Sequence, residues 1–128
     1  MMTKDILYWL VPVLFFAAIV LVKILGQVAP AKATGLLAGG AVVIDVREKG
    51  EFAGDHIARA INLPLGELAA RIGGVVPDKS TPVLVHCLSG TRSAMAKRTL
   101  GNLGYTNVHN LGSLGRARSI VEGATPAP

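Results

Sequence analysis

A long apolar segment near the start of the chain sets the first limit on its fold. Residues 6 to 25 contain a single charged side chain, Lys23. Twenty helical residues span about 30 Å, the thickness of the hydrocarbon core of a bilayer. Tyr8 and Trp9 lie near one end of the segment and Lys23 near the other, where aromatic rings and a long cationic side chain suit the membrane interface. The pattern predicts an uncleaved transmembrane anchor over residues 1–27.

The alternative for this segment is a cleaved signal peptide. Ala31-Lys32-Ala33 has the small-x-small form of a cleavage site. Against it, the apolar core is longer than the roughly 7 to 15 residues of a signal core, and Asp5 offsets Lys4 in the leader. Lys23 and Lys32 lie at and after the end of the helix, whereas Lys4 precedes it. This bias predicts a single-pass inner or plasma membrane protein whose carboxy-terminal domain is cytoplasmic.

Composition limits what the rest of the chain does. Without the anchor, roughly a hundred of the 128 residues remain, enough for one modest hydrophobic core. The net charge of +5 comes from scattered basic residues without interleaved aromatics, which argues against a nucleic-acid partner. Cys87 is the one cysteine, so an internal disulfide and a cysteine-rich metal site are both excluded. We expect no metal and no cofactor.

Apolar runs alternate with helical stretches after residue 28. The β-branched runs at 41–46 and 82–87 do not alternate with polar residues, which is typical of strands buried on both faces of a parallel sheet. Shorter strands are predicted at 60–62 and 107–109, and helices at 65–72 and 93–103. The order predicts an α/β domain over residues 28–122, an open parallel sheet with helices on both faces. Residues 123–128 are predicted to be a disordered tail.

A short loop joins the second long strand to the helix that follows it. Cys87 ends the strand and Arg92 opens the helix, and the residues between them are Leu88, Ser89, Gly90 and Thr91. A loop this tight points successive backbone N–H groups inward, and the helix adds its positive dipole end. A thiol inside that ring has a depressed pKa and attacks as a thiolate. Cys87 is therefore the predicted nucleophile, and residues 88–92 the predicted anion-binding loop.

Four ordered motifs between residues 28 and 122 resemble the single-domain rhodanese family. They are Asp45-Val46-Arg47-Glu48 with Glu51-Phe52; His56-Ile57 with Ala60-Ile61-Asn62-Leu63-Pro64; Cys87 to Ala94; and Gly104-Tyr105 with 108–111. The resemblance implies a sheet of about five strands. It also implies a sulfurtransferase: the cysteine takes sulfane sulfur from a small anionic donor such as thiosulfate, or from a persulfide. It then passes that sulfur to a thiol or to cyanide.

The chain departs from the family pattern at the loop. Leu88 stands where many thiosulfate-using relatives carry Arg or Lys, which lowers the expected preference for thiosulfate. Asp45 and Arg47 are supporting residues. Asp45 ends a strand and is a candidate to face the site, whereas Arg47 is expected to form an ion pair with Glu51 that fixes the loop. His56 is expected to be structural, because transfer to an ionised thiolate needs no base.

Two other functions use similar features. Cysteine phosphatases and arsenate reductases combine a thiolate with an arginine, but they place five residues between Cys and Arg, and this chain has four. A non-catalytic membrane adaptor is the second alternative. Such modules commonly lose the cysteine or the arginine, and both are present here.

Overall fold

The core of the domain is a parallel sheet. The computed structural model describes residues 3 to 124. Four strands pair in the order β2-β1-β3-β4, and all pairs are parallel. Their bounds are β1 Val42–Asp45, β2 Ile61–Asn62, β3 Val83–His86 and β4 Val108–Gly112. Each strand lies where the apolar runs predicted one, and the α/β fold class is confirmed.

The sheet has four strands in the described residues, where the resemblance implied about five. Beside β4, the N–H of Val28 donates to the carbonyl of Asn110 at 2.9 Å. Pro30 then begins a helix. Because the chain turns into a helix two residues after this contact, the segment makes one strand-like hydrogen bond and no ladder.

Five helices cover the sheet. Their bounds are α2 Pro30–Ala38, α3 Lys49–Gly54, α4 Leu65–Val75, α5 Thr91–Asn102 and α6 Leu114–Ala124. The predicted helices at 65–72 and 93–103 correspond to α4 and α5. The other three were not predicted. In α6, glycines and arginines hide a buried face made of Ala117, Ile120 and Val121. Because α6 runs to Ala124, the first two residues of the predicted disordered tail are helical, and 125–128 lie outside the described residues.

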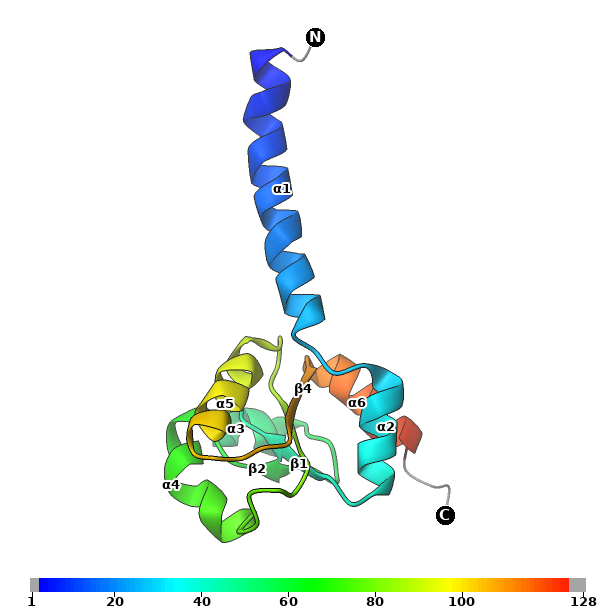
Figure 1. Ribbon diagram of the computed structural model, residues 1–128, viewed down its shortest axis with the longest axis vertical. Helices are drawn as coiled ribbons and strands as arrows, with labels where there is room; N and C mark the ends of the chain where they lie inside the picture. Colours follow the sequence, from blue (N-terminus) through cyan, green and yellow to red (C-terminus); the bar gives the residue numbers. More distant parts are fainter. Residues whose placement is uncertain (1–2, 125–128) are drawn as a thin grey trace.

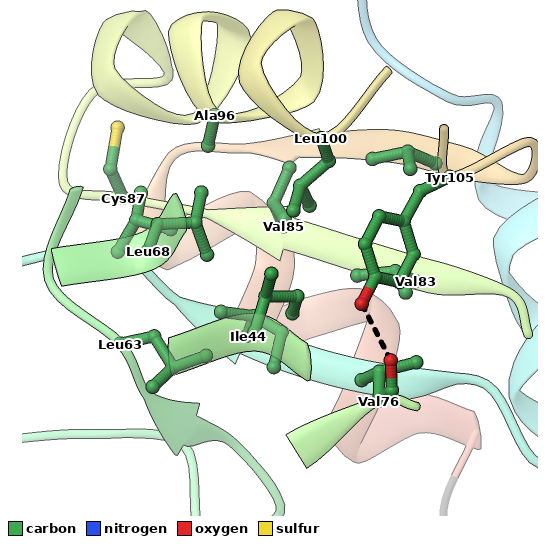
Figure 2. Packing of buried hydrophobic residues seen from close by; sticks show 13 residues of the cluster. Ile44, Leu63, Leu68, Val76, Val83, Val85, Cys87, Ala96, Leu100 and Tyr105 are labelled. Atoms are coloured by element: carbon green, nitrogen blue, oxygen red, sulfur yellow. Dashed lines mark hydrogen bonds between the residues drawn. The ribbon is translucent and has the colours of Figure 1, made fainter. Parts of the chain in front are cut away.

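The helices cover both faces of the sheet, as predicted. On one face, α4 and α5 pack their apolar side chains against Val83 and Val85 of β3, and Cys87 belongs to the same cluster (Figure 2). On the other face, α2 and α6 pack against Leu84. Alternate residues of a strand point to opposite faces, so each face of β3 has its own core.

The amino-terminal helix α1, Lys4–Leu25, rises away from the domain (Figure 1). It has 22 residues, none of them buried, so it extends about 33 Å with its apolar side chains exposed. By length and composition it is the one helix among the described residues that is suited to cross a membrane.

Candidate active site

The thiol of Cys87 lies at the carboxyl end of β3, inside the turn that leads into α5. Its Sγ accepts a hydrogen bond from the N–H of Gly90 at 2.9 Å and one from the hydroxyl of Ser93 at 3.5 Å. Gly90 has a φ of +98°, in the left-handed region that glycine adopts without strain. This conformation turns the chain back, so that the N–H of Gly90 meets the sulfur and α5 begins at Thr91.

The environment of the thiol favours its ionised form. Burial alone raises the pKa of Cys87, since the side chain has no exposed surface. Hydrogen bonds from the side chain of Ser93 and from the backbone of Ser93, Gly90 and Ser89 outweigh burial, and the pKa lies below its ordinary value. A buried thiol held by such donors is able to attack as a thiolate.

The backbone of the loop is braced by the end of β4 and by the start of α6. The N–H of Cys87 donates to the carbonyl of Gly112 at 3.2 Å, and the N–H of Leu114 donates to the carbonyl of Leu88 at 3.1 Å. These contacts occupy backbone groups. The side chain of Leu88 stays 54% exposed, so the position beside the nucleophile presents an apolar surface.

Arg92 is held by an acidic residue from α3. Its guanidinium donates to both carboxylate oxygens of Glu51, at 2.6 and 3.0 Å. The hydrogen bonds from Arg92 lower the pKa of Glu51 to about 2, and Glu51 raises the pKa of Arg92. The predicted Arg47–Glu51 pair is therefore wrong. Glu51 pairs across 41 positions of sequence with the arginine of the loop.

Arg47 turns back instead onto Asp45. Its Nη2 donates to Asp45 Oδ2 at 2.8 Å and its Nε to Oδ1 at 3.1 Å, and both residues are buried. The same Nη2 donates to the carbonyl of Asp55 at 2.7 Å. Asp45 is thus engaged by Arg47 and does not offer a free carboxylate to the thiol. The pair braces the segment that leads from β1 into α3.

Sequence reasoning missed two further residues at or near the site, Ser93 and His86, and a third, His56, agrees with it. Ser93 was not among the predicted site residues, although its place in the first turn of the helix after the loop was a usable signal. His86, also unpredicted, is buried, and its Nε2 lies 3.7 Å from Asp45 Oδ2. Burial lowers the pKa of His86, and its Nε2 has no hydrogen-bond partner among the described residues. His56 stacks on the ring of Phe52 at the surface, which agrees with the structural role expected for it.

Similar proteins place the chain in a family. The model of the rhodanese-like domain matches residues 29–114. Thiosulfate sulfurtransferase PspE of Escherichia coli is 45% identical over 71 residues, 56% of this chain and 68% of that protein. Thiosulfate sulfurtransferase GlpE of Pseudomonas entomophila is 34% identical over 100 residues, 77% of this chain and 90% of that protein.

Solved structures agree with these matches. The structure of rhodanese with anions from E. coli aligns with a TM-score of 0.58 and 42% identity, covering 60% of this chain and 91% of that one. The human single-domain sulfurtransferase TSTD1 aligns with a TM-score of 0.60 and 28% identity, covering 76% of this chain and 96% of that one. The chain belongs to the rhodanese family and is a rhodanese-like sulfurtransferase.

Proposed function

We propose that this protein is a membrane-anchored sulfurtransferase that carries sulfane sulfur as a persulfide on Cys87. The observation that carries the proposal is the pair of donors, the Gly90 N–H and the Ser93 hydroxyl, that meet the buried Sγ at the carboxyl end of β3. The same donors that stabilise a thiolate also stabilise the anionic terminal sulfur of a persulfide. Residues 88–92 would bind the donor, and Asp45 and Arg47 would support the site by bracing the segment that leads from β1 into α3.

Loading of the cysteine is a displacement at sulfur. The Cys87 thiolate attacks the outer sulfur of thiosulfate, a new S–S bond forms, and the bond between the two sulfurs of thiosulfate breaks. Sulfite leaves with the electron pair. Cys87 then bears the sulfane sulfur as a persulfide anion, so charge and atoms balance.

Unloading reverses the direction of attack. An acceptor thiol first loses its proton to water. Its thiolate sulfur then bonds to the terminal sulfur, and the S–S bond to Cys87 breaks. The electron pair returns to Sγ as thiolate, and the acceptor leaves as a persulfide. Cyanide takes the same sulfur to become thiocyanate. No base is required for attack by a group that is already ionised.

The loop suits a weakly charged donor better than thiosulfate. Leu88 supplies an exposed apolar side chain where a second cation is common in the family. The guanidinium of Arg92 already binds Glu51 through two hydrogen bonds, which partly neutralises its charge. We infer that thiosulfate loads Cys87 slowly and that a persulfide donor loads it faster.

Residues 1–27 would anchor the domain of residues 28–122 in the bilayer. The 22-residue helix α1 has the required length, and its side chains are exposed in the absence of lipid. Lysines after the helix favour a cytoplasmic domain in an inner or plasma membrane. The lipid bilayer is then a permanent partner of the protein.

Mass spectrometry of the intact protein tests the proposed carrier. Incubation with thiosulfate is expected to add one sulfur, about 32 Da, that dithiothreitol removes. Because Cys87 is the sole cysteine, the Cys87→Ser variant is a complete control. A mass gain in that variant, or none in the parent after both thiosulfate and a persulfide donor, would refute the assignment.

The adaptor alternative predicts an ordinary thiol. Its pKa would lie near the free value of about 8.5, whereas the sulfurtransferase requires a value well below it. The pH dependence of Cys87 alkylation by iodoacetamide measures this pKa directly, since no other thiol reacts.

A further inference from the structure

The end of α1 packs directly on the loop that holds Cys87. A Cβ placed on Gly90 would lie 3.3 Å from Cε of Lys23, and one placed on Gly112 would lie 2.6 Å from Nε2 of Gln27. Figure 1 shows the loop before α5 and the end of β4 at the side of the domain from which α1 rises. The carboxyl edge of the sheet, where the strands end, therefore lies on the side of the domain that α1 joins.

The connection between α1 and the domain is very short. Gly26 and Gln27 are the only residues between the end of α1 and Val28, which is hydrogen-bonded to β4. Arg116 adds a second tie, donating to the carbonyl of Val28 and, at 2.8 Å, to that of Leu111. With about 3.8 Å between successive Cα atoms, the domain cannot move far from the end of α1.

The surface beside this junction suits a bilayer interface. Leu88, in the same loop as Gly90, is 54% exposed. Large apolar side chains at such exposure are favourable in the interfacial layer and unfavourable in water.

Basic side chains gather at the same junction. A cavity of about 270 Å³ lies under the end of α1, and its lining includes Gln27, Lys32, Lys97, His109 and Asn110. Lys23, Lys32 and Lys97 form no ion pair with any described carboxylate. Anionic lipid headgroups would complement these charges.

We propose that the carboxyl edge of the sheet lies against the bilayer surface, and that Cys87 exchanges sulfur there with an amphiphilic thiol dissolved in the membrane. This inference rests on the proposed function, because it requires both the anchor and the persulfide on Cys87. A thiol that partitions into the interface is confined to a thin layer, so its effective concentration at the loop rises. Small soluble donors still reach the loop from the side, whereas a bulky soluble protein is excluded by the membrane.

The transfer keeps the balance described above. The amphiphilic thiol releases its proton to interfacial water, and its thiolate sulfur bonds to the terminal sulfur of the Cys87 persulfide. The S–S bond to Sγ breaks, Cys87 returns to thiolate, and the product is a membrane-dissolved persulfide.

Tryptophan quenching tests the placement. In full-length Trp9→Phe protein in vesicles containing anionic lipid, Leu88→Trp places the sole indole in the loop. Leu103→Trp is the matched control, because Leu103 is also exposed but lies at the other end of α5. Lipids brominated near the headgroup are expected to quench Leu88→Trp at least about twofold more. Equal quenching of the two variants would overturn the placement.

Acceptor kinetics test the substrate class. Protein loaded with sulfur in vesicles is offered N-acetylcysteamine or N-dodecanoylcysteamine, which share one thiol chemistry. We expect the long-chain thiol to react at least about tenfold faster at equal total concentration. Inserting eight Gly and Ser residues after Gln27 keeps the tether but frees the domain, and should reduce that ratio at least about threefold.

The outcomes separate the two proposals. If thiosulfate and a persulfide donor both fail to load Cys87, the proposed function fails. If loading is normal but the two thiols react equally, or the insertion leaves their ratio unchanged, the membrane-facing site is wrong and the sulfurtransferase stands. Normal loading of the insertion variant shows that its domain is folded.

Discussion

Replacement of Ser93 by alanine tests how this site ionises its cysteine. Ser93 Oγ lies 3.5 Å from Cys87 Sγ and 3.1 Å from the carbonyl oxygen of Gly90, and its single proton is shared between these two acceptors, so it both stabilises the thiolate and fixes the loop. A hydrogen bond to a charged group contributes about 1.5 to 3 kcal/mol, and the long distance to sulfur favours the lower end. One pKa unit corresponds to about 1.4 kcal/mol, so the pKa of Cys87 should rise by about one unit in Ser93→Ala.

The pH profile of alkylation provides the assay. Below the pKa, a rise of one unit lowers the thiolate fraction about tenfold, and the rate of iodoacetamide alkylation falls with it. Ser89→Ala is the matched control, because Ser89 is exposed and acts on the thiol through its backbone N–H. An unchanged profile in Ser93→Ala, or an equal shift in Ser89→Ala, would refute the assignment of the depressed pKa to the Ser93 hydroxyl.

Three further perturbations have defined outcomes. Leu88→Arg should lower KM for thiosulfate, by the equivalent of about 1.5 to 3 kcal/mol for one charge-assisted hydrogen bond, and an unchanged KM in steady-state assays would contradict this. Because the pKa of Glu51 is lowered from 4.5 to about 2, its pair with Arg92 should stabilise the fold fully above about pH 4.5 and lose that contribution as the pH falls towards 2. Urea unfolding should therefore show Glu51→Gln destabilised at pH 7 and indistinguishable from the parent near pH 2. If residues 6–25 anchor the protein, it should resist carbonate extraction, and its release by carbonate would contradict the anchor. A membrane-impermeant thiol reagent should label Cys87 only after cell lysis, and labelling in intact cells would contradict the orientation.

The elements that sequence predicted well depend on local patterns. β1 and β3 were recognisable because each lies in a continuous run of apolar, mostly β-branched residues. Such runs are typical of strands buried on both faces of a sheet. The loop was recognisable because a cysteine at a strand end, a glycine and a helix start are all local features. By contrast, α6 was missed, since its buried face of alanine, isoleucine and valine is set among glycines and arginines.

The sequence by itself determined the parts of this protein that need only neighbouring residues: an apolar helix long enough for a bilayer, the alternation of strands and helices along an α/β domain, and a tight turn that places donors around Cys87. Only the tertiary structure decided which charges pair. Arg92 and Glu51 are 41 positions apart, and Arg47, which is close to Glu51 in sequence, is buried against Asp45 instead. Ion pairs depend on the distance between side chains in the folded chain and on burial, and neither quantity is encoded in spacing along the sequence. The same reason explains why only the fold places Lys23 and Gln27, at and just after the end of α1, against the loop that holds Cys87.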